Sequence, residues 1–176
     1  ALTTGDYNTA VGFNALTADD VGDKSCAFGY GALGSQNIVS AGSTHNTGIG
    51  MQSGYYNVTG TNNTYLGYQA GYGASNESNS NNTAVGKDAL LSITTGSSNV
   101  VVGRDAGDAV TDGGNNVFIG ENSASATTSV ANSVLIGNNA GTSGVITTAA
   151  NGTVGVGAGA LQQLTSGAGN VAIGYQ

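Results

Sequence analysis

A five-residue phrase recurs along the whole chain and ends each time in glycine. Residues 8–12 and 82–86 carry it in the same form, Asn-Thr-Ala-Val-Gly. The ten final glycines are Gly12, Gly29, Gly50, Gly67, Gly86, Gly103, Gly120, Gly137, Gly157 and Gly174. Six of the nine intervals between them are 17 residues. Such a period is too short for two helices and fits one coil of a β-solenoid. We therefore predict an all-β fold, a parallel β-solenoid of about ten coils, in a single domain over residues 1–176.

The residue before each glycine is always apolar. Because residues two apart in a strand share a face, an apolar column of this kind is predicted to face the interior. The predicted buried ladder is Val11, Phe28, Ile49, Leu66, Val85, Val102, Ile119, Ile136, Val156 and Ile173. A column of Thr, Cys and Val lies two residues earlier, from Thr9 to Val171, and shares that face. The uncharged column between the two is then expected to point outward and to lie against another chain.

Three further regularities describe the coil. Each final glycine is expected to turn the chain at a corner that excludes a Cβ. The small residue three positions later, such as Ala89 or Ser123, indicates a confined space. Asparagine stands four residues before most of the glycines, as at Asn82 and Asn99. Since stacked coils lie about 4.8 Å apart, these side chains are predicted to form an amide ladder.

The remainder of each coil is predicted to contain a second short strand, as at residues 93–94 and 110–111. The intervals longer than 17 residues place their additional residues in the bend that follows. We expect loops around residues 38–44, 75–80 and 143–150.

Charged residues make up only 7% of the chain, and the net charge is −7. Binding to nucleic acid or to anionic membranes depends on Lys and Arg, and only Lys24, Lys87 and Arg104 are present. We therefore expect neither partner. No apolar run reaches the length of a membrane span, so no membrane insertion is expected.

The sequence contains no combination of side chains typical of catalysis. His45 is the only histidine and lacks a second ligand or a nucleophile. Cys26 replaces Thr or Val in the predicted inward column and is interpreted as a buried, inert thiol. Residues 155–160 fit a relaxed dinucleotide fingerprint, but no helical pattern follows them. Asp88 and Asp105 fit a solvated stack better than a calcium site. We predict no enzyme activity, no catalytic residues, no metal and no cofactor.

Aromatic residues provide the candidate binding positions. Six of the eight tyrosines lie between residues 30 and 72. The candidate contacts with a cell-surface glycan or receptor are Phe13, Tyr30, Tyr55, Tyr56 and Tyr68. The alternative, which we favour, is that the residues after the glycines pack at the corner or against a partner chain, because aromatic residues are common at oligomer interfaces.

Residues 82–90 (Asn-Thr-Ala-Val-Gly-Lys-Asp-Ala-Leu) and 63–71 (Asn-Thr-Tyr-Leu-Gly-Tyr-Gln-Ala-Gly) resemble repeats of phage tail-fibre proteins that end in a chaperone-of-endosialidase domain. They are also similar to the head repeats of YadA-like trimeric autotransporter adhesins, whose repeat is shorter. The resemblance covers all ten units. It implies a left-handed parallel β-roll, a homotrimer, and an extracellular or virion fibre that contacts a cell surface.

These observations predict a non-enzymatic fibre segment that acts as a rigid spacer and as an adhesive or receptor-binding surface. The repeat is interrupted at both ends, which suggests a segment of a longer array. One alternative is an extracellular filament whose subunits stack end to end through open sheet edges. Another is an ice-binding solenoid, suggested by the Thr column and disfavoured because that column is predicted to face inward.

Overall fold

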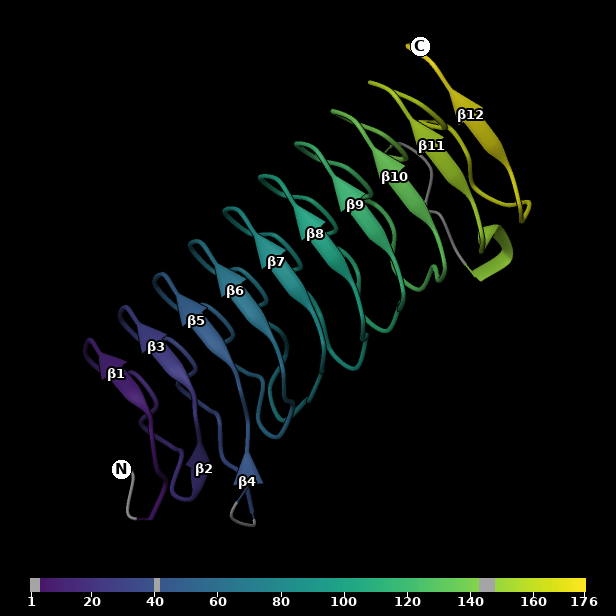
Figure 1. Cartoon of the computed structure of the whole chain (residues 1–176). Coiled ribbons are helices and arrows are strands. Elements are labelled where there is room, and N and C mark those ends of the chain that lie inside the picture. Colours follow the sequence, from purple (N-terminus) through teal and green to yellow (C-terminus); the bar gives the residue numbers. More distant parts are fainter. Residues whose placement is uncertain (1–3, 40–41, 143–147) are drawn as a thin grey trace.

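The computed structural model describes residues 4–39, 42–142 and 148–176, and it confirms an all-β parallel solenoid (Figure 1). Each coil contributes one three-residue strand to a ten-stranded parallel sheet, and the coils stack along one axis with the termini at opposite ends. The strands are β1 (Thr9–Val11), β3 (Cys26–Phe28), β5 (Thr47–Ile49), β6 (Thr64–Leu66), β7 (Thr83–Val85), β8 (Val100–Val102), β9 (Val117–Ile119), β10 (Val134–Ile136), β11 (Val154–Val156) and β12 (Val171–Ile173).

Additional structure lies in the three longer intervals and also in the 17-residue interval between Gly12 and Gly29. Strands β2 (Gly22–Asp23) and β4 (Gly42–Ser43) form a second, two-stranded parallel sheet. Glu77, in the second predicted loop, forms an isolated parallel bridge with Asn57. A 3-10 turn, η1 (Thr148–Ala150), ends the third predicted loop, and residues 143–147 of that loop lie outside the described residues.

The predicted second strand at residues 93–94 and 110–111 is absent, and the chain bends there instead. Ile93 and Val110 turn their side chains inward and are fully buried. Backbone contacts between coils persist, since the amide of Thr94 donates to the carbonyl of Thr111 at 2.8 Å. The prediction was wrong because an apolar residue followed by Thr is compatible with a bend as well as with a strand.

Adjacent strands pair with equivalent residues opposite one another, so each strand position forms a continuous column. The prediction of the buried column was wrong. The middle residue of each strand points into the coil, and Ala84, Val101 and Phe118 have no exposed surface. The residues placed in a buried ladder point outward instead: Val11, Phe28, Ile49, Leu66, Val102, Ile119 and Ile173 are exposed, and Val85, Ile136 and Val156 are partly exposed.

The physical reason for this reversal is the narrow interior of the coil. Each strand sends one side chain inward, where it meets side chains from the returning segment, such as Leu90 and Ile93. The sizes are complementary across this space. The ring of Tyr65 occupies room left by Gly54, where an added Cβ would lie 2.5 Å from the ring, and a Cβ on Gly48 would lie 2.9 Å from the side chain of Leu33.

The amide ladder and the corner glycines are confirmed. Asn99 donates from Nδ2 to Asn82 Oδ1 at 3.0 Å and to the carbonyl of Gly113 at 2.9 Å. Asn82 Oδ1 also accepts the backbone N–H of Asn99 at 3.0 Å, so the ladder pairs buried donors in successive coils. At the corner, Gly103 has φ +144°, and a Cβ there would collide with the carbonyl of Gly120 in the next coil.

Candidate interaction surface

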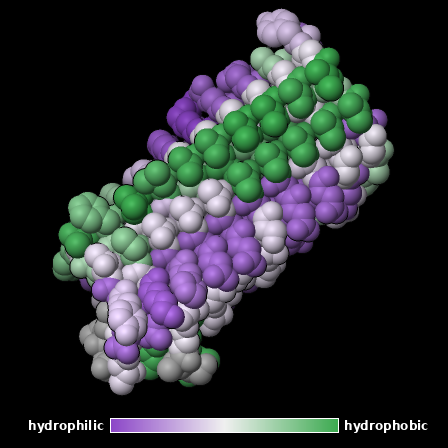
Figure 2. Space-filling model, in the orientation of Figure 1, coloured by the Kyte–Doolittle hydropathy of each residue, from purple (hydrophilic) through white to green (hydrophobic). Residues whose placement is uncertain are grey.

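The outward face of the ten-stranded sheet carries the most distinctive surface of the molecule. It consists of the column before the glycines and a second column two residues earlier: Thr9, Cys26, Thr47, Thr64, Thr83, Val100, Val117, Val134, Val154 and Val171. We call these two columns the apolar stripe. They contain no charged residue, and Figure 2 shows a continuous hydrophobic band along the length of the rod.

Every side chain of the apolar stripe is at least partly exposed. Val102 and Ile119 each keep 37% of their surface exposed, and Leu66 keeps 44%. Soluble monomers rarely expose contiguous apolar patches larger than a few hundred Å². A band of this length therefore has the character of an interaction surface rather than of scattered exposed residues.

An aromatic column lies directly after the corner glycines, beside the N-terminal half of the stripe. It consists of Phe13, Tyr30, Met51 and Tyr68, all of which are exposed. Phe13 and Tyr30 stack with their ring centroids 5.6 Å apart. Lys87 Nζ, in the next coil, lies 5.8 Å from the centroid of the Tyr68 ring. Three of the five predicted glycan contacts are therefore in one column that borders the stripe.

The other two predicted contacts, Tyr55 and Tyr56, belong to a separate half-buried cluster with Tyr72, which the sequence argument did not include among the candidates. Tyr56 meets the other two rings edge-on, with centroids 4.8 and 5.0 Å away. Tyr55 and Tyr72 stack at 5.8 Å. Burial, and then hydrogen bonding to Tyr56, raises the pKa of Tyr72. The three rings therefore pack on one another and do not belong to the aromatic column.

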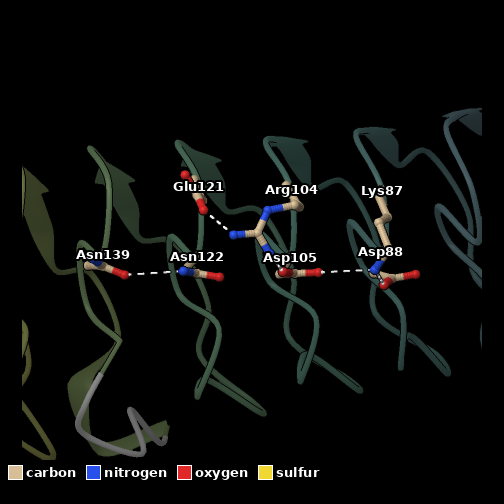
Figure 3. A network of polar contacts seen from close by, with 7 residues as sticks. All are labelled: Lys87, Asp88, Arg104, Asp105, Glu121, Asn122 and Asn139. Carbon is tan, nitrogen blue, oxygen red and sulfur yellow. Dashed lines mark hydrogen bonds and ion pairs between the residues drawn. The ribbon is translucent and has the colours of Figure 1, made fainter.

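In the three coils that follow Tyr68, the same column carries charged residues instead of aromatic ones (Figure 3). Lys87 pairs with Asp88, and Arg104 pairs with Asp105 in its own coil and with Glu121 in the next. The hydrogen bond that Lys87 donates to the carboxylate of Asp88 raises the pKa of Lys87. Arg104 is therefore a surface ion partner that links two coils.

Carboxylates lie close together beside this column. Burial, followed by the charge of Asp105, raises the pKa of Asp108. Asp112 behaves in the opposite way, because a hydrogen bond from Ser129 lowers its pKa. Within the described part of the chain, no group of three or more His, Cys, Asp or Glu side chains could hold a metal ion.

The remaining sequence candidates occupy unremarkable positions. His45 is exposed, and Gly157 of the fingerprint-like segment is a corner glycine with φ +131°. The interpretation of Cys26 as a buried thiol was wrong, because Cys26 lies half-buried on the outward face of β3. Among the described residues, no helix is long and apolar enough to cross a membrane.

One feature of the surface was missed altogether. Ala158 and Gly159 form the floor of a hollow of about 160 Å³ at the corner of the coil that contains β11. Its walls are the side chains of Asn138, Asn139, Gln162, Tyr175 and Gln176. A pair of small residues in positions that are large in the neighbouring coils is the sequence signal that could have found it.

Models of known protein families, curated proteins and solved structures were all compared with the chain, and none of them matches it.

Proposed function

We propose that the chain is a non-enzymatic structural segment of an extracellular or virion fibre, in which copies pack side by side along the apolar stripe. The observation that carries the proposal is the stripe itself. All-parallel sheets are almost always covered on both faces. In this chain the returning segments cover the inner face, while the outer face is apolar and exposed along the rod. An additional layer is needed to bury it.

A second copy of the chain is the occupant that fits best. It offers a stripe of the same length, coil spacing and absence of charge. The basic residues Lys87 and Arg104 are already paired with carboxylates of their own chain, so they do not supply a surface for an acidic partner. Three copies, as in the proteins that the repeats resemble, would place the stripes around a common axis. The rod would then act as a stiff spacer.

Replacing one outward apolar residue with a charge tests the association. Light scattering is expected to give wild-type protein a mass three times the 17.1 kDa of one chain. Ile119→Asp places a charge in the stripe without touching the interior, and it is expected to give single chains with an unchanged circular dichroism spectrum. Ser92→Asp adds the same charge to the returning segment after β7 and is expected to leave the mass unchanged. A wild-type mass of one chain at high concentration would refute side-by-side packing.

Cys26 provides an independent test because it is the only cysteine and lies on the stripe. A short bis-maleimide is expected to link two wild-type chains. The control is Cys26→Ser combined with Ser92→Cys, which moves the thiol to the half-buried returning segment and is expected to prevent linkage. End-to-end stacking would separate the Cys26 residues of neighbouring chains by the length of the rod. Efficient linkage of the control alone would favour a different packing.

Ice binding is a second candidate because the Thr column faces outward. The inward direction predicted for this column had disfavoured ice binding, and that prediction was wrong. Thr9, Thr47, Thr64 and Thr83 stand on a regular, uncharged sheet face. Bulky Phe28 and Leu66 interrupt the neighbouring column, and for that reason we rank self-association first. Measurement of thermal hysteresis with the Ile119→Asp single chain separates the two functions, since no hysteresis is expected from a self-association surface.

A further inference from the structure

The hollow at the corner of the β11 coil arises because three successive coils carry side chains of unequal size at two equivalent positions. Ala158 and Gly159 stand directly after the corner glycine of their coil. The same two positions hold Asn138 and Asn139 in the preceding coil, and Tyr175 and Gln176 in the following one. Since coils are about 4.8 Å apart, the two flanking coils are separated by about 9.6 Å. The small side chain of Ala158 therefore leaves a notch one coil wide, and the side chain of Gln176 bounds this notch beside Gly159.

Amide groups line this notch. Asn139 donates from Nδ2 to Asn138 Oδ1 at 2.7 Å, and Asn139 Oδ1 accepts from Asn122 Nδ2 at 3.3 Å (Figure 3). These contacts fix the two asparagines on one wall. On the other side, Gln176 Cβ lies 3.2 Å from the place where a Cβ of Gly159 would stand, and Oε1 of Gln162 and Oε1 of Gln176 each lie 3.8 Å from it. Each amide offers both donors and acceptors, which suits a ligand rich in hydroxyl groups.

The third component is the ring of Tyr175, which lines the edge of the hollow. An exposed aromatic face can cover the apolar face of a sugar ring while its hydroxyl forms hydrogen bonds. None of the side chains that line the hollow is charged. A basic residue to hold an anionic group is therefore missing from the lining.

We propose that this hollow binds one ring of a neutral sugar, with the ring stacked on Tyr175 and its hydroxyl groups bonded to the amides. The site is small and shallow, so the affinity of one hollow is expected in the millimolar range. It lies at the corner rather than on the apolar stripe, and the proposal does not depend on self-association. Where copies do associate, each hollow is repeated and weak binding gains avidity.

Saturation-transfer NMR with neutral mono- and disaccharides at millimolar concentration tests the site. Wild-type protein is expected to transfer saturation to at least one of them. Ala158→Tyr should abolish the transfer, because the ring fills the hollow. The variant is expected to fold, since Tyr30 and Tyr68 occupy the same position in other coils. Tyr175→Ala is expected to weaken binding about tenfold, the loss that removal of one stacking ring gives.

Met51→Tyr is the matched control. It introduces the same ring in the same column, in a coil that lacks the hollow, and is expected to leave the transfer unchanged. Binding that survives Ala158→Tyr would overturn the proposal, as would binding that is lost on Tyr55→Ala instead. The absence of transfer to every neutral saccharide in the panel would overturn it as well. Light scattering of the same samples reports self-association separately, so the two proposals can fail independently.

Discussion

Two polar columns run through the same coils with the same spacing, one inside the rod and one on its surface. The inner column contains Asn82 and Asn99, whose amides are buried and hydrogen-bonded from coil to coil. The outer column contains Lys87 and Arg104, whose side chains are 55% and 51% exposed. Unpairing a buried polar group costs about 1–3 kcal/mol, whereas an exposed ion pair contributes about 0–1 kcal/mol. Regular spacing therefore identifies a column, but the contribution of that column to stability depends on how deeply its side chains are buried.

The same contrast applies to apolar side chains and gives the largest expected effect. Phe118 points into the coil, and its ring fills space beside Gly107. Phe118→Ala is expected to lower the free energy of unfolding by about 3–5 kcal/mol because it leaves a cavity. Phe28→Ala removes an outward ring that is 55% exposed in one chain, and in the single-chain Ile119→Asp background it is expected to cost less than half as much as Phe118→Ala in that background. Urea denaturation of both variants at equal protein concentration measures the difference. Equal losses would mean that the outer face is buried as tightly as the interior.

The next largest effect is expected in the amide ladder. Asn99→Ala leaves the carbonyl of Gly113 and the backbone N–H of Asn116 without their partners in the ladder. We expect a loss of about 3 kcal/mol in the free energy of unfolding, the sum of buried groups that lose hydrogen bonds. Asn37→Ala, at an exposed position, is the matched control and should change it by less than about 0.5 kcal/mol. A small loss for Asn99→Ala would show that the ladder is incidental to stability.

The sequence was sufficient to predict the coils, the corner glycines and the amide ladder, because each depends on spacing and on local backbone geometry. It was not sufficient to decide which face of the strand points inward. Apolar character favoured the column that contains Val102, yet the narrow interior takes the column that contains Val101. The informative signal was size. Tyr65 is followed six residues later by Gly71, whereas Ala84 is followed by Leu90. A large inward residue is thus matched with a small one across the coil.

The candidate site was predictable only in part, for a related reason. The aromatic column of Tyr30 and Tyr68 followed from spacing alone. The outward direction of Cys26 was missed because it depends on the choice of face. The hollow beside Tyr175 was missed because it is created by side chains that Ala158 and Gly159 lack. Recurring residues reveal a column, but they do not reveal a position at which the large side chain of the neighbouring coils is absent.

The smallest effect is expected in the charged column. Arg104→Ala removes contacts to Asp105 and Glu121, and we expect a far smaller change in the free energy of unfolding than for Asn99→Ala because the pair is exposed to solvent. Raising the salt concentration should reduce the difference between variant and wild type further, since counterions screen surface charges. Asn99→Ala should show no such dependence on salt, because its lost contacts involve neutral, buried groups. The opposite result would be a loss for Arg104→Ala that is as large as that for Asn99→Ala and insensitive to salt. Such a loss would mean that the charged column is covered. An interface between copies that extends past the apolar stripe onto this corner would cover it.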